Sequence, residues 1–119
     1  MTFAAPEKPI LCIDDDPAAL ELRKILLERN GYEVLATTNT SEGLRMFKAE
    51  QVCLVIADQL LKDKTGTDLA REMKRLKQHV PILLYSGTVP QSLDYVDCFV
   101  LKTEPITKVL AFIRDVLTR

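Results

Sequence analysis

The sequence predicts an α/β fold in which helices wind around both faces of a five-stranded parallel sheet. Five short apolar runs alternate with segments of helical periodicity, which is typical of a parallel sheet wrapped by helices. The runs ILCI (10–13) and VCLVIA (52–57) are apolar at every position, as central strands buried on both faces are. With 119 residues, 47% of them hydrophobic and 28% charged, the chain has the size and composition of one domain spanning residues 1–119.

The five apolar runs are the candidate strands. The second run is less uniformly apolar than the others and is therefore expected near an edge of the sheet. The fourth and fifth runs are separated only by residues 88–97, which leave room for a short helix at most. The predicted strands are residues 10–13, 32–38, 52–58, 81–87 and 98–102.

The helices are predicted from periodicity and from their end signals. Asp16 is a favourable N-cap before Pro17, and Gly31 follows the last periodic residue, so the first helix lies between them. Its buried stripe is expected to comprise Ala18, Leu22, Ile25 and Leu26. Further helices are predicted at residues 40–50, around 69–76 and at about 105–117, with a short fifth helix within residues 88–97.

Composition argues against several kinds of function. A net charge of −1 gives no electrostatic reason to bind nucleic acid or an anionic membrane, and the apolar runs are too short to span a bilayer. The N-terminal segment lacks a basic flank followed by an apolar core, so we expect a cytoplasmic protein. The basic side chains within residues 62–77 are interspersed with acidic ones, which predicts a solvated face. The cysteines lack CxxC spacing and are expected to be buried free thiols: Cys12, Cys53 and Cys98.

Polar side chains follow four of the predicted strands at the point where each strand ends. In an open parallel sheet, ligands bind outside the carboxyl ends of the strands. Each residue also has a simpler explanation, because Asp16 suits a helix cap, Asp58 or Ser86 a turn, and Lys102 a solvated strand end. Their joint placement favours a functional site. The residues concerned are Asp14, Asp15, Asp16, Asp58, Ser86 and Lys102.

These residue types suit phosphoryl chemistry. Several carboxylates around one pocket favour a hard divalent cation such as Mg²⁺, which offsets their mutual repulsion. One carboxylate can then act as a nucleophile toward phosphorus and form an acyl phosphate. A hydroxyl group and an ammonium group are still needed to hold the phosphoryl oxygens, and Ser86 and Lys102 supply them.

With these residues in these positions, the sequence resembles the receiver domain of bacterial two-component response regulators, of the chemotaxis-regulator type. The resemblance rests on four motifs, ILCIDDDP, LVIAD, PILLYSG and FVLK, and it covers the chain from about Pro9 to Leu117. It implies a flavodoxin-like fold with strand order 2-1-3-4-5. It also implies that Mg²⁺ is held by Asp14, Asp15, Asp58 and the backbone carbonyl of Leu60.

The resemblance further implies how such a domain works. Asp58 would accept a phosphoryl group from a sensor histidine kinase or a phosphotransfer protein, with Ser86 and Lys102 binding its oxygens. Phe99 matches the switch aromatic of the family and would move when Ser86 is drawn to the phosphate. Phosphorylation would alter one face of the domain, which would contact a downstream protein or effector domain and could also support a homodimer. This face is made by the helix within 88–97, the fifth strand and the last helix.

The domain would therefore be a signalling switch and not an enzyme. The alternative is a degenerate receiver that is never phosphorylated and acts only as a protein docking module. A metal-dependent phosphatase is less favoured, because the sequence shows no second acid–base constellation. The chain could be a stand-alone protein or a segment of a longer kinase or regulator.

Three positions depart from the usual family pattern. Thr103 replaces the proline that commonly follows the strand-five lysine, so a trans bond is expected there. Lys62 replaces a common proline of the phosphoacceptor loop, whereas Gly66 of that loop is kept. Leu60 is apolar and is expected to shield a phosphoryl group from water, which leads to the hypothesis of slow autodephosphorylation.

Overall fold

The computed structural model describes residues 8–118, so residues 1–7 and 119 of the predicted domain lie outside the described part of the chain. Within these limits the fold is a parallel sheet with strand order β2-β1-β3-β4-β5 and four helices, which confirms the predicted fold class and strand order. The strands are β1 (Ile10–Ile13), β2 (Val34–Thr37), β3 (Leu54–Ala57), β4 (Ile82–Ser86) and β5 (Cys98–Leu101). The helices are α1 (Pro17–Arg29), α2 (Thr40–Ala49), α3 (Gly66–Leu76) and α4 (Thr107–Leu117).

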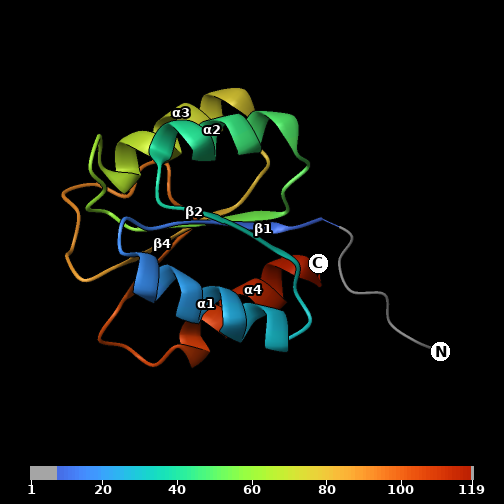
Figure 1. Cartoon of the computed structure of the whole chain (residues 1–119). Helices are drawn as coiled ribbons and strands as arrows, with labels where there is room; N and C mark the ends of the chain where they lie inside the picture. Colours follow the sequence, from blue (N-terminus) through green and yellow to red (C-terminus); the bar gives the residue numbers. More distant parts are fainter. Residues whose placement is uncertain (1–7, 119) are drawn as a thin grey trace.

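Two layers of helices enclose the sheet, with α2 and α3 on one face and α1 and α4 on the other (Figure 1). Strand β1 is fully buried and its side chains alternate between the faces. Ile10 and Cys12 pack in the cluster beneath α1 and α4, whereas Leu11 and Ile13 pack beneath α2 and α3. Strand β3 is buried in the same way, and β2 lies at the sheet edge as predicted. The residues that follow β1 and β3 therefore emerge side by side from the centre of the sheet.

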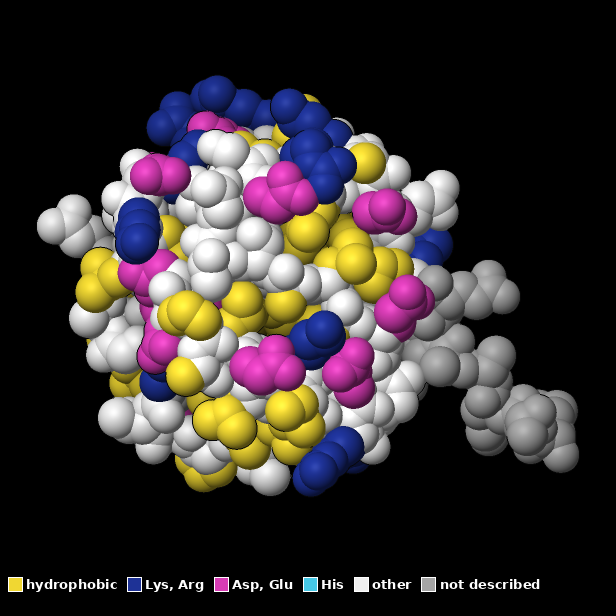
Figure 2. All heavy atoms as spheres, viewed as in Figure 1, with side chains coloured by type: hydrophobic (Ala, Val, Ile, Leu, Met, Phe, Trp, Pro, Cys, Tyr) yellow, Lys and Arg dark blue, Asp and Glu magenta, His cyan; other side chains and the backbone are white. Residues whose placement is uncertain are grey.

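The buried stripe of α1 differs from the predicted one. Its buried residues are Leu20, Arg23 and Leu27, whereas Leu22 is 71% exposed and Ile25 is 38% exposed. The buried face that contains Leu20 and Leu27 also contains the charged Arg23, so hydrophobic periodicity did not indicate this face. Asp16 does cap α1, as predicted, because its side chain accepts hydrogen bonds from the first amides of the helix. Figure 2 shows the resulting hydrophobic surface over α1 in yellow.

The fifth predicted helix is wrong, because residues 88–97 form no helix. Pro90 has no amide hydrogen and disfavours the helical conformation at Val89, the residue before it. The segment instead forms bends and turns. Too few residues remain after Pro90 for a helix that also has to connect to β5.

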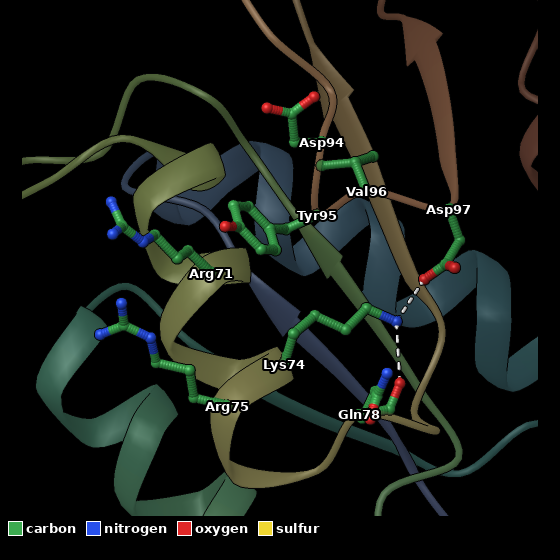
Figure 3. Close-up of a pocket in the computed structure, with 8 residues that line it drawn as sticks. All are labelled: Arg71, Lys74, Arg75, Gln78, Asp94, Tyr95, Val96 and Asp97. Atoms are coloured by element: carbon green, nitrogen blue, oxygen red, sulfur yellow. Dashed lines mark hydrogen bonds and ion pairs between the residues drawn. The ribbon is translucent and has the colours of Figure 1, made fainter.

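The end of this segment is tied to its neighbours through Asp97. One carboxylate oxygen of Asp97 accepts hydrogen bonds from the Ile82 amide at 2.7 Å and from Lys74 Nζ at 2.7 Å. A cavity of about 480 Å³ lies between α3 and this segment, with Lys74 reaching across it (Figure 3). It is lined by Arg71, Lys74, Arg75, Gln78, Asp94, Tyr95, Val96 and Asp97.

The missing helix also changes the predicted output face. On β5, Cys98 and Val100 belong to the cluster beneath α1 and α4, so Phe99 points to the opposite face of the sheet. Phe99 is half-buried and lies opposite Leu84 of β4. Within residues 8–118, the predicted output and homodimer face therefore lacks one of its three elements.

The three cysteines are free thiols, as predicted, although only Cys12 is fully buried. Burial raises the pKa of the Cys12 thiol to about 12, so this thiol is neutral at physiological pH. Among the described helices, none has the length and apolar character needed to cross a membrane.

The basic side chains of residues 62–77 are solvated only in part, unlike the predicted face: Arg71 and Arg75 are exposed, whereas Lys64 and Lys77, which flank α3, are partly buried. Lys64 Nζ pairs with Glu72 at 2.9 Å, and Lys77 Nζ donates a hydrogen bond to the Phe47 carbonyl at 2.6 Å. Lysine and arginine side chains gather at the top of Figure 2, over α2 and α3, with acidic groups among them.

Candidate functional site

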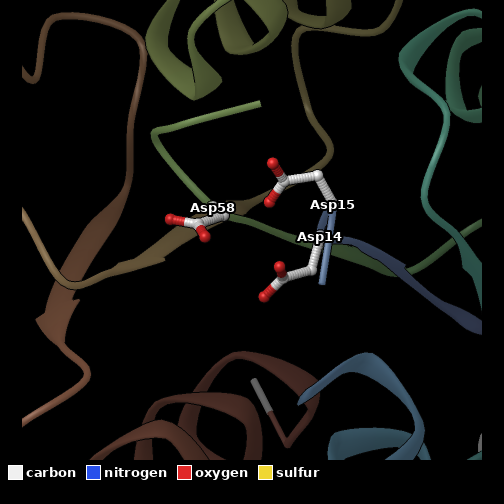
Figure 4. A group of neighbouring side chains, drawn as sticks. All are labelled: Asp14, Asp15 and Asp58. Carbon is white, nitrogen blue, oxygen red and sulfur yellow. The ribbon is translucent and has the colours of Figure 1, made fainter. Parts of the chain in front are cut away.

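Three carboxylates meet at the carboxyl ends of the two central strands. Asp14 and Asp15 follow β1 and Asp58 follows β3, and these strands are adjacent and in register, with Ile13 opposite Ala57. One carboxylate oxygen of each aspartate lies within 4.8 Å of the others (Figure 4). Oxygen atoms at this spacing can share one divalent cation. The structure thus brings together the three aspartates that the sequence singled out.

Lys102 joins two of these carboxylates. Its Nζ lies 2.9 Å from Asp14 Oδ2 and 3.0 Å from Asp58 Oδ2, and 28% of its side chain is exposed. Burial acts to lower the pKa of Lys102, but the hydrogen bonds to Asp14 and Asp58 outweigh it and raise the pKa above its usual value. Lys102 therefore carries a positive charge at the centre of the acidic site.

Asp14 is the most deeply buried carboxylate of the group, with no exposed surface. Its burial acts to raise its pKa, but the hydrogen bond from the Asp16 amide and the ammonium of Lys102 outweigh burial and lower the pKa. The Asp16 amide donates to Asp14 Oδ1 at 3.0 Å. Asp14 is therefore ionised at neutral pH and held on both oxygens.

Thr103 does not displace Lys102. Residues 8–118 contain no cis peptide bond, so the bond between Lys102 and Thr103 is trans, as predicted. The Lys102 amide donates to the Ser86 carbonyl at 2.8 Å and continues the pairing of β5 with β4. The pairing of β5 with β4 thus fixes where Lys102 leaves the sheet, and its side chain still reaches Asp14 and Asp58.

The other candidate residues surround this centre in different ways. Ser86 is buried at the end of β4, and its hydroxyl oxygen accepts a hydrogen bond from the Thr88 amide at 3.2 Å. Leu60 lies in the loop after β3 with 59% of its surface exposed. Phe99 lies on the face of β5 opposite to Cys98 and Val100. Among the described residues, the Ser86 hydroxyl makes no hydrogen bond to the aspartates.

Two residues near the site were not identified from the sequence. Arg23 of α1 pairs with Asp14, with 3.1 Å between Nη2 and Oδ2. Gln59 is buried, and its side chain accepts from the Thr67 amide at 3.0 Å, which links the end of β3 to the start of α3. For Arg23, the only signal in the sequence is its place in an amphipathic helix, three residues after the predicted first turn. Gln59 had no signal other than its position beside Asp58.

Gly66 is needed where α3 begins beside Asp58. A Cβ atom at Gly66 would overlap the backbone carbonyl oxygen of Asp58 and would lie 2.6 Å from Leu84 Cδ1. Both neighbours are fixed by β3 and the core. The close approach of α3 to the site therefore requires a residue without a side chain.

We expect Gly66→Ala to lower the free energy of unfolding by about 1–3 kcal/mol, because backbone must move to relieve the overlap. Urea unfolding measures this change. Gly87→Ala is the matched control, because a Cβ at Gly87 meets nothing within 4 Å. Equal stability of the two variants would contradict the prediction.

Comparison with known proteins agrees with this geometry. The model of the family described as response regulator receiver domain matches residues 10–103. The transcriptional regulatory protein GlrR of Escherichia coli is 30% identical in an alignment 103 positions long, which covers 83% of this chain and 23% of GlrR. This chain therefore spans less than a quarter of the length of that relative.

Solved structures show the same fold. A CheY-like response regulator receiver domain from Methanospirillum hungatei is 30% identical with a TM-score of 0.87, and the match covers 93% of this chain and 94% of that one. The response regulator TrrA of Thermotoga maritima, in complex with Mg²⁺-BeF, is 27% identical with a TM-score of 0.86 over 92% of this chain and 98% of TrrA. TrrA has also been solved in complex with the histidine kinase ThkA. The family match, together with the aspartates and lysine gathered at the carboxyl edge of the sheet, places this chain in the family of response regulator receiver domains of two-component systems.

Proposed function

We propose that the chain is one phosphoaccepting receiver domain in which Asp58 takes a phosphoryl group from a histidine kinase or a phosphotransfer protein. The observation that carries this proposal is the position of Lys102, whose ammonium group lies between Asp14 and Asp58. From this position the ammonium group can remain beside Asp58 and bind the oxygens of a phosphoryl group that is attached to Asp58. The resulting charge change would be signalled to a downstream protein or effector domain.

The carboxylates suit Mg²⁺ as the cofactor of this reaction. Their oxygens are hard ligands, and the three groups lie close enough to share one ion. We propose Asp14, Asp15 and Asp58 as ligands, together with the backbone carbonyl of Leu60. Bound Mg²⁺ would neutralise the charge that develops on the phosphoryl oxygens. The complex of TrrA with Mg²⁺-BeF supports Mg²⁺ as the cofactor.

The transfer itself needs few protein groups. A carboxylate oxygen of Asp58 attacks phosphorus, a P–O bond forms as the P–N bond of a phosphohistidine breaks, and the imidazole nitrogen keeps the bonding electron pair. Lys102 and Ser86 hold the phosphoryl oxygens during this exchange. Ser86 and Phe99 are the proposed switch residues, since drawing Ser86 toward the phosphate would disturb β4, which pairs with the strand that carries Phe99.

An apolar groove beside Lys102 offers a docking place for the phosphoryl donor. It has a volume of about 370 Å³ and lies between α1 and the start of α4. Its apolar lining includes Leu22, which is 71% exposed, and Ile106. The complex of TrrA with the histidine kinase ThkA supports a protein donor of this class.

Incubation with acetyl phosphate and Mg²⁺, followed by intact mass measurement, tests the proposal. We expect the mass to increase by one phosphoryl group. This increase should not occur when EDTA removes Mg²⁺ from the incubation, and it should not occur in Asp58→Asn. Glu104→Gln is a matched control, because it removes a carboxylate that pairs with Lys108 on the surface. No phosphorylation with acetyl phosphate or a phosphorylated kinase would instead favour a degenerate receiver that acts only by docking.

We expect Leu60→Asn to shorten the lifetime of the phosphorylated protein by roughly tenfold, because an amide can orient water where the leucine excludes it. Leu60 is exposed in the loop after β3, so the substitution should not disturb the core. The decay of the phosphorylated mass in Mg²⁺ measures the lifetime. Leu93→Asn, at an exposed leucine 42% accessible to solvent in the segment before β5, serves as the control. Unchanged decay in Leu60→Asn would refute shielding by this side chain.

A further inference from the structure

Arg23 of α1 is a buried cation in direct contact with the acidic site. The residue is only 6% exposed, and its Nη2 donates to Asp14 Oδ2 at 3.1 Å. The guanidinium carbon lies 4.9 Å from the centre of the Tyr85 ring. These two contacts hold the guanidinium group between the carboxylate and the aromatic face.

Packing alone does not explain an arginine at this position. Its neighbours in the buried stripe of α1 are Leu20 and Leu27, and its Nε is buried without a hydrogen-bond partner among residues 8–118. Replacing a buried ion pair by an apolar side chain of similar volume is often neutral or stabilising. The contact with Asp14 is therefore the feature that distinguishes Arg23 from an ordinary core residue.

Arg23 and Lys102 share the same acceptor atom. Both lie within 3.1 Å of Asp14 Oδ2, while Asp14 Oδ1 accepts the Asp16 amide. The site thus contains three carboxylates and two cationic side chains, and both cations pair with Asp14. Lys102 is partly exposed on a flexible stem, whereas Arg23 is buried and its planar guanidinium group is held against Tyr85.

We propose that Arg23 is a positioning residue that acts as a fixed counter-charge for the acidic site. It holds Asp14 in place without a metal ion and lowers the affinity of the site for a divalent cation. When a phosphoryl group on Asp58 draws Lys102 away, Arg23 keeps Asp14 paired. This inference rests on the proposed binding of Mg²⁺ and phosphoryl at the site.

A Mg²⁺ titration without any phosphoryl donor, followed by calorimetry, tests this proposal. Arg23→Gln retains a donor for Asp14 but removes the charge, and we expect it to bind Mg²⁺ roughly tenfold more tightly than the unmodified protein. Arg23→Met, which also removes the donor, should bind more tightly as well. Arg23→Lys retains the charge and should bind with nearly unchanged affinity.

Arg29→Met is the matched control. It removes the same charge from the exposed end of the same helix, and its Mg²⁺ affinity should stay unchanged. A second measurement is the rise in melting temperature that Mg²⁺ produces, which should be larger in Arg23→Gln, because a tighter ligand stabilises the native state more. This measurement also reports whether each variant folds.

Equal or weaker Mg²⁺ binding by Arg23→Gln, or equal effects of Arg23→Gln and Arg23→Lys, would overturn the counter-charge role. The phosphorylation test on the unmodified protein is independent of this outcome. A protein that takes up phosphoryl but shows no effect of Arg23→Gln retains its proposed function and loses only this inference. If Mg²⁺ binds only after Arg23→Gln, the counter-charge is supported and the Mg²⁺-dependent function of the unmodified protein fails.

Discussion

Asp15→Asn is expected to slow Mg²⁺-dependent phosphorylation of Asp58 on the order of 100-fold. Asp15 supplies one of the three carboxylates that lie within 4.8 Å of one another. The amide of asparagine has no charge and is a weaker ligand for Mg²⁺. The rate of mass gain with acetyl phosphate, measured over a range of Mg²⁺ concentrations, should show the loss as a shift of the half-maximal rate to higher Mg²⁺.

Asp16→Asn provides the control for this experiment. It removes the same charge from the adjacent residue, but Asp16 caps α1, and asparagine is an equally good cap. Phosphorylation and stability should therefore change little. If both variants lost phosphorylation equally, the acidic run would act as one undivided cluster, which would contradict the separation into a metal-binding pair and a helix cap.

Lys102→Met is expected to slow phosphorylation at saturating Mg²⁺ on the order of 100-fold, because the phosphoryl oxygens lose their ammonium partner. It should also lower the free energy of unfolding in EDTA by about 2 kcal/mol, since Asp14 and Asp58 both lose a charged hydrogen-bond partner. Asp14 keeps Arg23, which limits the loss of stability. Mass measurement and urea unfolding test the two effects separately.

The matched control is Lys108→Met. Lys108 pairs with Glu104 on the surface and is 60% exposed, so its removal should leave both quantities nearly unchanged. A Lys102→Met variant that is phosphorylated as fast as the unmodified protein would contradict the proposed role. A variant that loses stability but not rate would limit Lys102 to a structural role.

The central strands and the acidic residues were predictable because their sequence signals are local. Continuous apolar runs indicate strands buried on both faces, and β1 and β3 have this pattern in the structure. Asp16 before Pro17 predicted the start of α1 for the same reason. Strand order came from the resemblance, and with that order the topology brings Asp14, Asp15 and Asp58 to one place.

The segment before β5 and the buried face of α1 were predicted less well, because distant contacts decide them. Residues 88–97 are held by the contacts that Asp97 makes with β4 and α3, and no local pattern reveals these partners. Arg23 has the sequence pattern of an exposed side chain. Its burial depends on Asp14, which follows β1, and on Tyr85 of β4, and both lie outside the helix that carries Arg23.

The sequence by itself determined the alternation of strands and helices, the helix cap at Asp16 and the set of polar residues at the strand ends. Hydrophobic periodicity and capping are properties of neighbouring residues, so they can be read along the chain. Only the tertiary structure decided that residues 88–97 form no helix and that Lys102 bridges Asp14 and Asp58. It also decided that Arg23 faces the acidic site, because the burial of a charge depends on partners that the fold brings from elsewhere in the chain.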